Sequence, residues 1–392
     1  MQIRFINQIS QINDQQWQQL DNASSNPFIS KHFLQALEVS GAASQQGGWQ
    51  PHHLIIESNQ QLIAFMPLYL KTHSYGEYVF DWSWADAYQR YGLAYYPKLV
   101  SAIPYTPSQG ERLLVHPNYQ KADLVPLLVE AIKTEAKRLG ASSWHLLFTQ
   151  EDEQQLFANQ QLHTRLGCQF HWFNTENWQT FDAFLSSFSA KKRKNVKQER
   201  RKVRDQGLLV ERVEGKAITP ALLEHFYHCY QITYLRRGRQ AYLSQSFFEQ
   251  LLLLMPEQML LVVAKEEATQ QPLAAALFFY DKTSLYGRYW GSKVDADSLH
   301  FEACYYQGIE YCLEKGLTHF DPGTQGEHKI SRGFQPLITQ SHHWLAEATF
   351  NKAIQQFVQE EALGVQHYVE QACQQLPFKA EHSCVTSKRV IT

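Results

Sequence analysis

Residues 320–345, FDPGTQGEHKISRGFQPLITQSHHWL, are the stretch around which the rest of the chain is organised. They follow a predicted helix over Phe301–Lys315, which Gly316 ends, and a short predicted strand over Leu317–Asp321. Five charged or titratable side chains then occur within a dozen residues: Asp321, Glu327, His328, Lys329 and Arg332. Ligands of α/β folds usually bind at loops that follow strand ends, so this density favours a functional loop. A solvated turn would also carry such charges.

The same order of elements occurs twice along the chain, as strand, strand, strand, helix and strand. The first set is predicted at His53–Glu57, Leu62–Leu70, Leu113–His116, Asp123–Leu139 and Trp144–Phe148. The second set is predicted at Leu260–Ala264, Leu273–Tyr280, Leu285–Trp290, Phe301–Lys315 and Leu317–Asp321. The two sets match in pattern rather than in identity. This repetition predicts an α/β (α+β) protein with two similar domains, over residues 1–175 and 176–392.

An aromatic insertion over residues 72–112 interrupts the first set. It places Asp81 and Asp86 among aromatic residues that include Trp82 and Trp84. Aromatic walls with a few charges suit an acceptor that carries an amine or a sugar, through cation–π contact and stacking. We therefore predict that these four residues line a substrate pocket. A lobe that simply buries its aromatic side chains explains them equally well.

A strongly basic segment, residues 181–207, lies between the two sets. Nine side chains between Lys191 and Arg204 are Lys or Arg, against Glu199 alone. Val196 and Val203 give a narrow apolar seam, which predicts a helix lying on the surface. Such dense positive charge favours a phosphate-bearing ligand, with Arg193 and Arg200 as contacts, although a solvated helix face is the alternative. After residue 345 the chain ends in a further helical segment.

Composition limits the class of protein. The chain has 392 residues, of which 44% are hydrophobic and 19% charged, with a net charge of −2. These values predict an ordinary globular protein rather than a globally basic nucleic-acid coat. The sequence contains neither an apolar run long enough to span a membrane nor a signal-peptide core. Six scattered cysteines show no metal-ligand spacing, so we expect reduced thiols, no metal and a cytoplasmic location.

The run HKISRGFQP resembles the F-K-x-x-F-G segment of the Fem family of aminoacyl transferases. Nearly the whole chain resembles the FemAB-like family of predicted N-acyltransferases, through YVFDWSWADAYQRYGLAYYPKL, KKRKNVKQERRKV, LYGRYWG, HFEACYYQGIEYC and FDPGTQGEHKISRGF. This resemblance implies two tandem domains of the GNAT acyltransferase fold. It also implies transfer of an activated acyl or aminoacyl group to an amine, on a peptidoglycan-related precursor. Arg288, in LYGRYWG, and Glu302, at the start of the predicted helix, join the expected substrate contacts.

The implied reaction needs a base, because an alkyl amine with a pKa near ~10 is mostly protonated at neutral pH. We expect Glu327 and His328 to serve as the base, with Asp321 as the group that orients it. Lys329 and Arg332 would bind substrate, and Arg332 could grip a carboxylate or phosphate bidentately. The alternative is that Arg332 pairs with Glu327 or Asp321 and locks the loop. Backbone N–H groups beside Leu285–Trp290 would stabilise the oxyanion.

The acyl donor stays open between aminoacyl-tRNA and acyl-CoA, and no tightly bound cofactor is expected. The glycine-rich pyrophosphate loop of GNAT enzymes is missing before both predicted helices, where the chain reads HPNYQKAD and SKVDADSLH. This counts against ordinary acetyl-CoA use. Two other functions are compatible with the sequence. One is a non-catalytic module that recognises cell-wall precursors, and the other is an acyl-CoA-dependent acetyltransferase.

Overall fold

The computed structural model describes residues 1–20, 26–324, 326–379 and 384–385. The chain forms two compact units. The first unit comprises Met1–Gly167 and Thr339–Val365, and the second comprises Cys168–Ile338 and Gln366–Thr392. The sequence pattern instead places the division at residue 175 and gives residues 339–365 to the second domain. They belong to the first unit because strand β15 (Gln335–Leu345) pairs with β8 (Ser143–Leu147) through its second half.

The first unit is built from two groups of strands. One is a sheet in the order β1-β3-β4-β7, and the other runs β15-β8-β6-β5-β2. The strands not yet given are β1 (Gln2–Ile6), β2 (Trp49–Pro51), β3 (His53–Ser58), β4 (Gln61–Met66), β5 (Tyr69–Lys71), β6 (Lys98–Ser101) and β7 (Leu114–Val115). The helices are α1 (Asp14–Leu20), α2 (Lys31–Val39), α3 (Trp82–Arg90), α4 (Lys121–Leu139) and α5 (Glu151–Ala158). The apolar stripe of α4 packs against residues of β3, β4, β6 and β8, forming one core.

The aromatic insertion folds as helix α3 and strand β6 within the first unit. Trp84 and Tyr88 of α3 are buried against Leu345 and the first turns of α12 (Ala348–Gln374). The prediction that this region buries aromatic side chains is therefore confirmed for these two residues. Trp82 on the same helix is 39% exposed.

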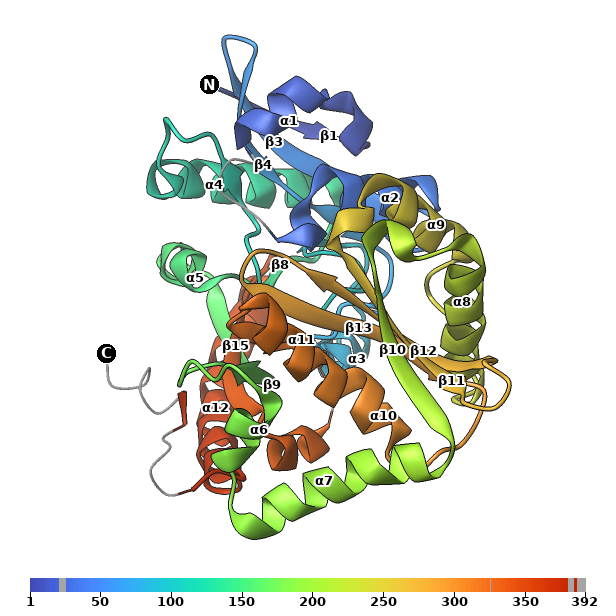
Figure 1. The fold of residues 1–392 in the computed structure, drawn as a ribbon. Helices are drawn as coiled ribbons and strands as arrows, with labels where there is room; N and C mark the ends of the chain where they lie inside the picture. Colours follow the sequence, from blue (N-terminus) through green and yellow to red (C-terminus); the bar gives the residue numbers. More distant parts are fainter. Residues whose placement is uncertain (21–25, 325, 380–383, 386–392) are drawn as a thin grey trace. The chain divides into compact units, whose positions relative to one another are not determined.

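The second unit contains strands in the order β10-β11-β12-β13-β14-β9. Their bounds are β10 (Leu208–Glu214), β11 (Met259–Glu266), β12 (Pro272–Tyr280), β13 (Ser284–Ser292), β14 (His319–Asp321) and β9 (His163–Phe173). Helices α8 (Pro220–Leu235) and α9 (Gln245–Leu254) cover one face, and α11 (Gln307–Lys315) covers the other (Figure 1). Gly291 of β13 allows α8 to approach closely, because a Cβ there would lie 1.8 Å from the carbonyl oxygen of Cys229.

Strands β13 and β14 are parallel, and they pair over a short distance. The pairing covers Ser284–Tyr286 on β13 and His319–Asp321 on β14. Strand β13 continues to Ser292, beyond the last residue that pairs with β14. The separation of the two strands leaves room for side chains and loops at the end of β14.

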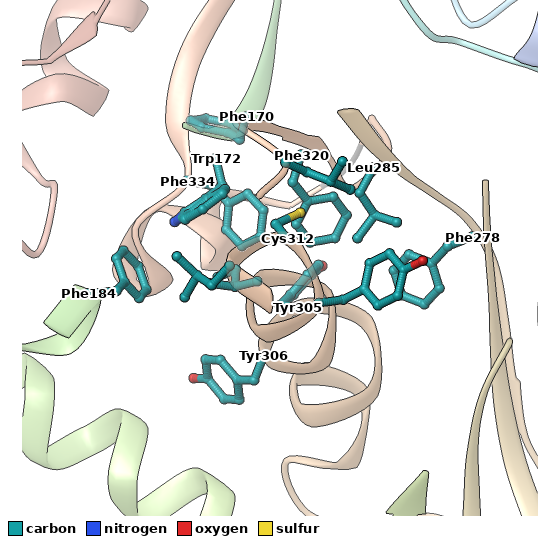
Figure 2. Close-up of a cluster of buried hydrophobic side chains, with 14 of the residues drawn as sticks. Phe170, Trp172, Phe184, Phe278, Leu285, Tyr305, Tyr306, Cys312, Phe320 and Phe334 are labelled. Carbon is teal, nitrogen blue, oxygen red and sulfur yellow. The ribbon is translucent and has the colours of Figure 1, made fainter. Parts of the chain in front are cut away.

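The predicted helix Phe301–Lys315 is present but is not regular. It begins as α10 (Leu299–Phe301), passes through a π-helical turn, η5 (Glu302–Tyr306), and continues as α11. A π turn shifts the helix face, and such turns are frequent at functional sites. Figure 2 shows Tyr305 and Tyr306 of this turn in the aromatic core of the second unit, which also contains Phe320 and Phe334. Sequence periodicity gave no indication of the irregularity.

The basic segment forms two helices rather than one, α6 (Phe181–Ser186) and α7 (Ala190–Asp205). Val196 and Val203 are buried, as the apolar seam predicted. The break between the two helices lies where Phe184 and Phe188 insert into the core of the second unit. No helix in the described part of the chain is long and apolar enough to cross a membrane.

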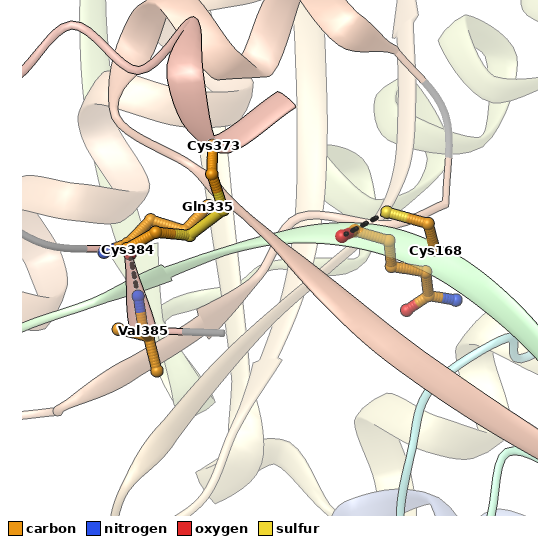
Figure 3. The surroundings of a disulfide bond; sticks show 6 residues. Cys168, Gln335, Cys373, Cys384 and Val385 are labelled. Atoms are coloured by element: carbon orange, nitrogen blue, oxygen red, sulfur yellow. Dashed lines mark hydrogen bonds between the residues drawn. A yellow bond between two sulfur atoms is a disulfide. The ribbon is translucent and has the colours of Figure 1, made fainter. Parts of the chain in front are cut away.

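The expectation that all cysteines are reduced is wrong for one pair. Cys373, in the last turn of α12, forms a disulfide with Cys384, as Figure 3 shows. The backbone N–H of Val385 then donates a hydrogen bond of 2.8 Å to Oε1 of Gln335, the first residue of β15. Cys168, Cys229, Cys304 and Cys312 are free. Sequence spacing alone did not reveal that the tail returns to α12.

Candidate active site

The charged stretch after β14 forms a short 3-10 helix, η6 (Glu327–Arg332), in the second unit. Asp321 precedes it and is completely buried. Its carboxylate pairs with Arg288 of β13, accepts the backbone N–H of Gly323 at 2.9 Å and lies 3.7 Å from Nε2 of His171. Burial lowers the pKa of His171 to about 3, so the imidazole is neutral. Asp321 thus holds Arg288 across the gap where β13 and β14 separate.

Lys329 points into the same buried region and is 1% exposed. Its ammonium group donates to the carbonyl oxygen of Gly323. Burial lowers the pKa of Lys329 to about 7, although the negative charge of Asp321 opposes this effect. The side chain can therefore exist with or without its proton at neutral pH.

Arg332 uses all three guanidinium nitrogens within the protein. Nε and one terminal nitrogen donate to Glu199 of α7 at 3.2 and 2.7 Å, and the other terminal nitrogen donates to the carbonyl of His328 at 2.6 Å. The guanidinium also lies 3.4 Å from the ring centre of Phe301. Its partner is Glu199, neither Glu327 nor Asp321. A bidentate grip on a ligand would have to displace Glu199.

Glu327 and His328, the expected bases, are both exposed. Glu327 accepts a hydrogen bond of 2.8 Å from the hydroxyl of Tyr368. Nε2 of His328 shares a hydrogen bond of 2.8 Å with the hydroxyl of Tyr305. Partial burial and the charges of Arg332 and Lys329 lower the pKa of His328 below 6.5. A neutral, accessible imidazole is the form that can accept a proton.

A pocket of about 360 Å³ opens beside this group, between the end of β13 and the start of α10. Its lining includes Trp290, Asp295, Asp297 and His300. The His300 ring lies 5.6 Å from Trp290 and 6.0 Å from His328, centre to centre, and burial lowers its pKa to about 4. His328 itself does not line the pocket, and His300 is the lining residue that contacts its ring.

The loop that forms one side of this pocket is held by α7. Lys202 pairs with Asp297 at 2.7 Å, and the backbone N–H of Asp297 donates to the side chain of Gln206 at 3.0 Å. The loop contains the stretch SKVDADSLH, which has no glycine. Its acidic side chains make it a poor site for a pyrophosphate.

Arg200 and Glu302, both expected to contact substrate, form an ion pair with each other. Arg200 donates to Glu302 at 2.9 and 2.8 Å and to Glu310 at 2.5 and 3.1 Å, so its charge is neutralised by two carboxylates. Glu302, which the sequence predicts to contact substrate, is buried. Unlike Arg200, Arg193 has no ion pair within the described residues. The same holds for its neighbours Lys191, Lys192 and Lys194.

The four candidates of the aromatic insertion lie in the first unit and have different surroundings. Asp81 is 2% exposed and binds Lys98 and the hydroxyl of Tyr95, the latter at 2.6 Å. Trp84 is in the core, with the Arg165 guanidinium 5.2 Å from its ring centre. Trp82 and Asp86 are exposed. Only these last two can meet a ligand without rearrangement.

The site residues predicted from sequence do not include several side chains that complete the arrangement in the second unit. They are His171, Glu199, His300, Tyr305, Tyr306 and Glu310. Glu199 stands out in the sequence as the single acidic residue between Lys191 and Arg204, but its partner could not be inferred from that. The tyrosines do not stand out, because their directions depend on the π turn. Across the described residues no group of three or more His, Cys, Asp or Glu side chains is placed to hold a metal ion.

Comparison with known proteins identifies the family. The sequence matches the FemAB-like family, described as peptidoglycan biosynthesis/recognition, over residues 8–380. The chain belongs to the FemAB-like family. No curated protein matches this FemAB-like sequence.

Solved structures resemble this FemAB-like protein at low identity. FemX shares 13% identity with a TM-score of 0.53, covering 91% of this chain and 100% of the FemX chain. The C-terminal domain of a putative lysylphosphatidylglycerol synthetase from Agrobacterium fabrum shares 12% identity with a TM-score of 0.52, covering 86% and 92%. A tandem GNAT protein from the clavulanic acid biosynthesis pathway shares 10% identity with a TM-score of 0.47, and the match covers 88% of this chain and 98% of that protein's chain. The predicted mixed α/β, Fem-like fold is confirmed.

Proposed function

We propose that this protein transfers an activated acyl or aminoacyl group to an amine acceptor at the site in its second unit. The observation that carries the proposal is a neutral, accessible imidazole, His328, which follows Glu327 and precedes the buried Lys329 and contacts His300, a residue that lines the 360 Å³ pocket. Membership of the FemAB-like family supports acyl or aminoacyl transfer as the reaction class.

In the proposed reaction the acceptor nitrogen attacks the carbonyl carbon of the donor. A new C–N bond forms, the bond from the carbonyl carbon to the leaving oxygen or sulfur breaks, and no covalent enzyme intermediate is needed. His328 takes the proton from the acceptor nitrogen, and the leaving group takes up a proton in turn. Glu327 is the second candidate for the base.

Two features would stabilise the negative charge that develops on the carbonyl oxygen. Main-chain N–H groups of β13 after Tyr286 lie beyond the end of its pairing with β14. The protonated form of Lys329 adds a positive charge in a buried region. Asp321 contributes by holding Arg288 and by favouring the charged form of Lys329.

The first turn of α7 supports a phosphate-bearing donor. Its four cations, Lys191 to Lys194, lie where the helix dipole disfavours positive charge, and phosphate groups would relieve their repulsion. The acidic loop beside the pocket weighs against CoA, so we favour an RNA-borne donor. The family description supports a peptidoglycan-related acceptor. The cytoplasm, where such precursors and aminoacyl-tRNA would be present, is the proposed compartment, with no tightly bound cofactor.

The test begins with mass spectrometry of ligands that co-purify with the native protein, which identifies candidate donors and acceptors. Transfer is then measured with these compounds for the wild type, His328→Gln and the control His367→Gln, which changes an exposed histidine of α12. We expect His328→Gln to lose turnover while retaining binding. Binding without turnover in the wild type would favour a recognition module, which the family description also allows.

A further inference from the structure

Glu199 makes its contacts with other elements rather than with the cations of its own helix. It accepts hydrogen bonds from Nε and a terminal nitrogen of Arg332 at 3.2 and 2.7 Å, and from the hydroxyl of Tyr306. Arg332 ends η6, and Tyr306 ends the π turn. One carboxylate on α7 therefore joins the two segments that border His328.

Arg332 links Glu199 to the main chain at His328, because it binds both. Its second terminal nitrogen donates to the carbonyl of His328 at 2.6 Å and to Oγ of Ser331 at 3.2 Å. The guanidinium plane rests on Phe301 and the side chain is 6% exposed. Because every side of the guanidinium is in contact, it cannot turn without breaking hydrogen bonds. The main chain of η6 is thereby held at the residue that carries the imidazole.

The imidazole itself is held by two further contacts. The ring lies against Gly326, where a Cβ would be only 2.0 Å from Cε1 of His328. Gly326 also has a φ of +108°, which disfavours any other residue. Nε2 bonds to Tyr305, and the next residue, Tyr306, bonds to Glu199. The π turn thus directs Tyr305 toward the imidazole of His328 and Tyr306 toward the carboxylate of Glu199.

We propose that Glu199 is a positioning residue which, through Arg332 and Tyr306, fixes the direction of the His328 imidazole. The importance of that direction rests on the proposed function, in which His328 accepts the proton of the amine. The direction itself is a property of the protein alone. It is therefore measurable whether or not the transfer reaction has been found.

The experiment uses the full chain labelled with ¹⁵N-histidine and records the ring nitrogen signals by NMR, with His328→Gln assigning the residue. The variants are Glu199→Gln, Glu199→Asp and the control Glu310→Gln. Glu310 is a matched control because it also accepts from an arginine, Arg200, and its side chain is 24% exposed, as is that of Glu199.

We expect the wild type to show His328 mainly as one tautomer, since the bond to Tyr305 fixes the role of Nε2. In Glu199→Gln the two ring signals should move toward the tautomeric average, and Glu199→Asp should lie between. Glu310→Gln should match the wild type. Unchanged signals in a folded Glu199→Gln would overturn the proposal.

Two other results also test the positioning role of Glu199. Equal changes in Glu310→Gln and Glu199→Gln would show a general loosening and overturn the proposal. If Glu199→Gln does not fold, Glu199→Asp carries the test, and wild-type signals in that variant overturn it. A failed transfer assay with normal NMR results would count against the proposed function and leave the positioning role intact.

Discussion

Lys71 and Lys98 lie directly opposite each other in the antiparallel pair β5–β6, and both side chains are completely buried. Like charges in facing positions destabilise a sheet unless they are compensated. Lys98 donates to Glu77 at 2.8 Å, to Ser74 at 2.9 Å and to Asp81. Burial lowers the pKa of Lys71 to about 7, so its charge is partly removed. The carboxylates of Glu77 and Asp81, both in the insertion, thus compensate the buried charge of Lys98.

Asp81→Asn should destabilise the protein by about 3 kcal/mol, because it leaves the buried ammonium of Lys98 less compensated. Thermal and urea unfolding would measure the change. Asp86→Asn is the matched control, since Asp86 is exposed on α3, only a few residues along the chain. Equal stability of the two variants would contradict a structural role for Asp81 and return it to the substrate-binding candidates.

Arg332→Ala should lower the melting temperature, with a loss of about 3 kcal/mol, because it leaves Glu199 without its arginine. Arg332→Lys should lose part of this stability, since an ammonium cannot contact Glu199 and the His328 carbonyl at once. Melting curves and ligand titrations on both variants give the answer. Wild-type melting with weakened ligand binding would instead support the direct role in ligand binding predicted from sequence.

Lys329 should make stability rise between about pH 7 and pH 10.5. The unfolded side chain keeps its proton up to 10.5, whereas the folded one loses it above about 7. Folding therefore releases a proton in this window, and the cost of burying the charge disappears as pH rises. Lys329→Met should flatten the increase in melting temperature, and Lys282→Met, an exposed control, should not. Equal pH profiles for Lys329→Met and the wild type would refute this assignment.

Replacing Lys191 and Arg193 with Gln should weaken binding of unacylated tRNA and lower the salt slope, by roughly 0.7–0.9 for each phosphate that the protein no longer neutralises. The matched control is Arg201→Gln with Lys202→Gln, which removes the same charge where ion pairs already exist. Arg200→Gln should destabilise folding instead, because it leaves Glu302 and Glu310 unpaired. A salt slope equal to that of the wild type means that the first turn is a solvated face.

Reducing the Cys373–Cys384 disulfide should cost about 2–3 kcal/mol, as expected for closing a short loop. Melting with and without a dithiol reductant measures the loss. Cys373→Ser should melt like the reduced wild type and should not respond to the reductant. A response in the variant as large as in the wild type would show that reduction acts elsewhere.

The sequence predicted the elements of the second unit well, since strands such as β12 and the end of α11 at Gly316 follow from apolar runs and glycine. The charged loop at η6 was also found, because Asp321, Lys329 and Arg332 stand close together in the chain. Their partners were not found. Glu199 is 133 positions from Arg332, and the π turn that aims Tyr305 and Tyr306 has no signature in periodicity.

The predicted roles of Arg200 and Asp81 illustrate a second limit. From sequence, a charge in a basic helix or an aromatic insertion looks available for a ligand. Arg200 instead meets Glu302 and Glu310, more than a hundred residues away, and Asp81 meets Lys98. Whether a charge is free depends on contacts between distant elements, which composition and spacing do not contain.

Each unit is built from two separate segments of the chain, and this affects which truncations and gene fragments can encode a whole unit. Because Thr339–Val365 belongs to the first unit, a stop codon after Ile338 would remove a strand from a unit that is otherwise complete by Gly167. Nor would a gene fragment ending at Gly167 encode a whole unit. Neither half can therefore be inherited or lost as a contiguous piece, so recombination is constrained to keep the two together.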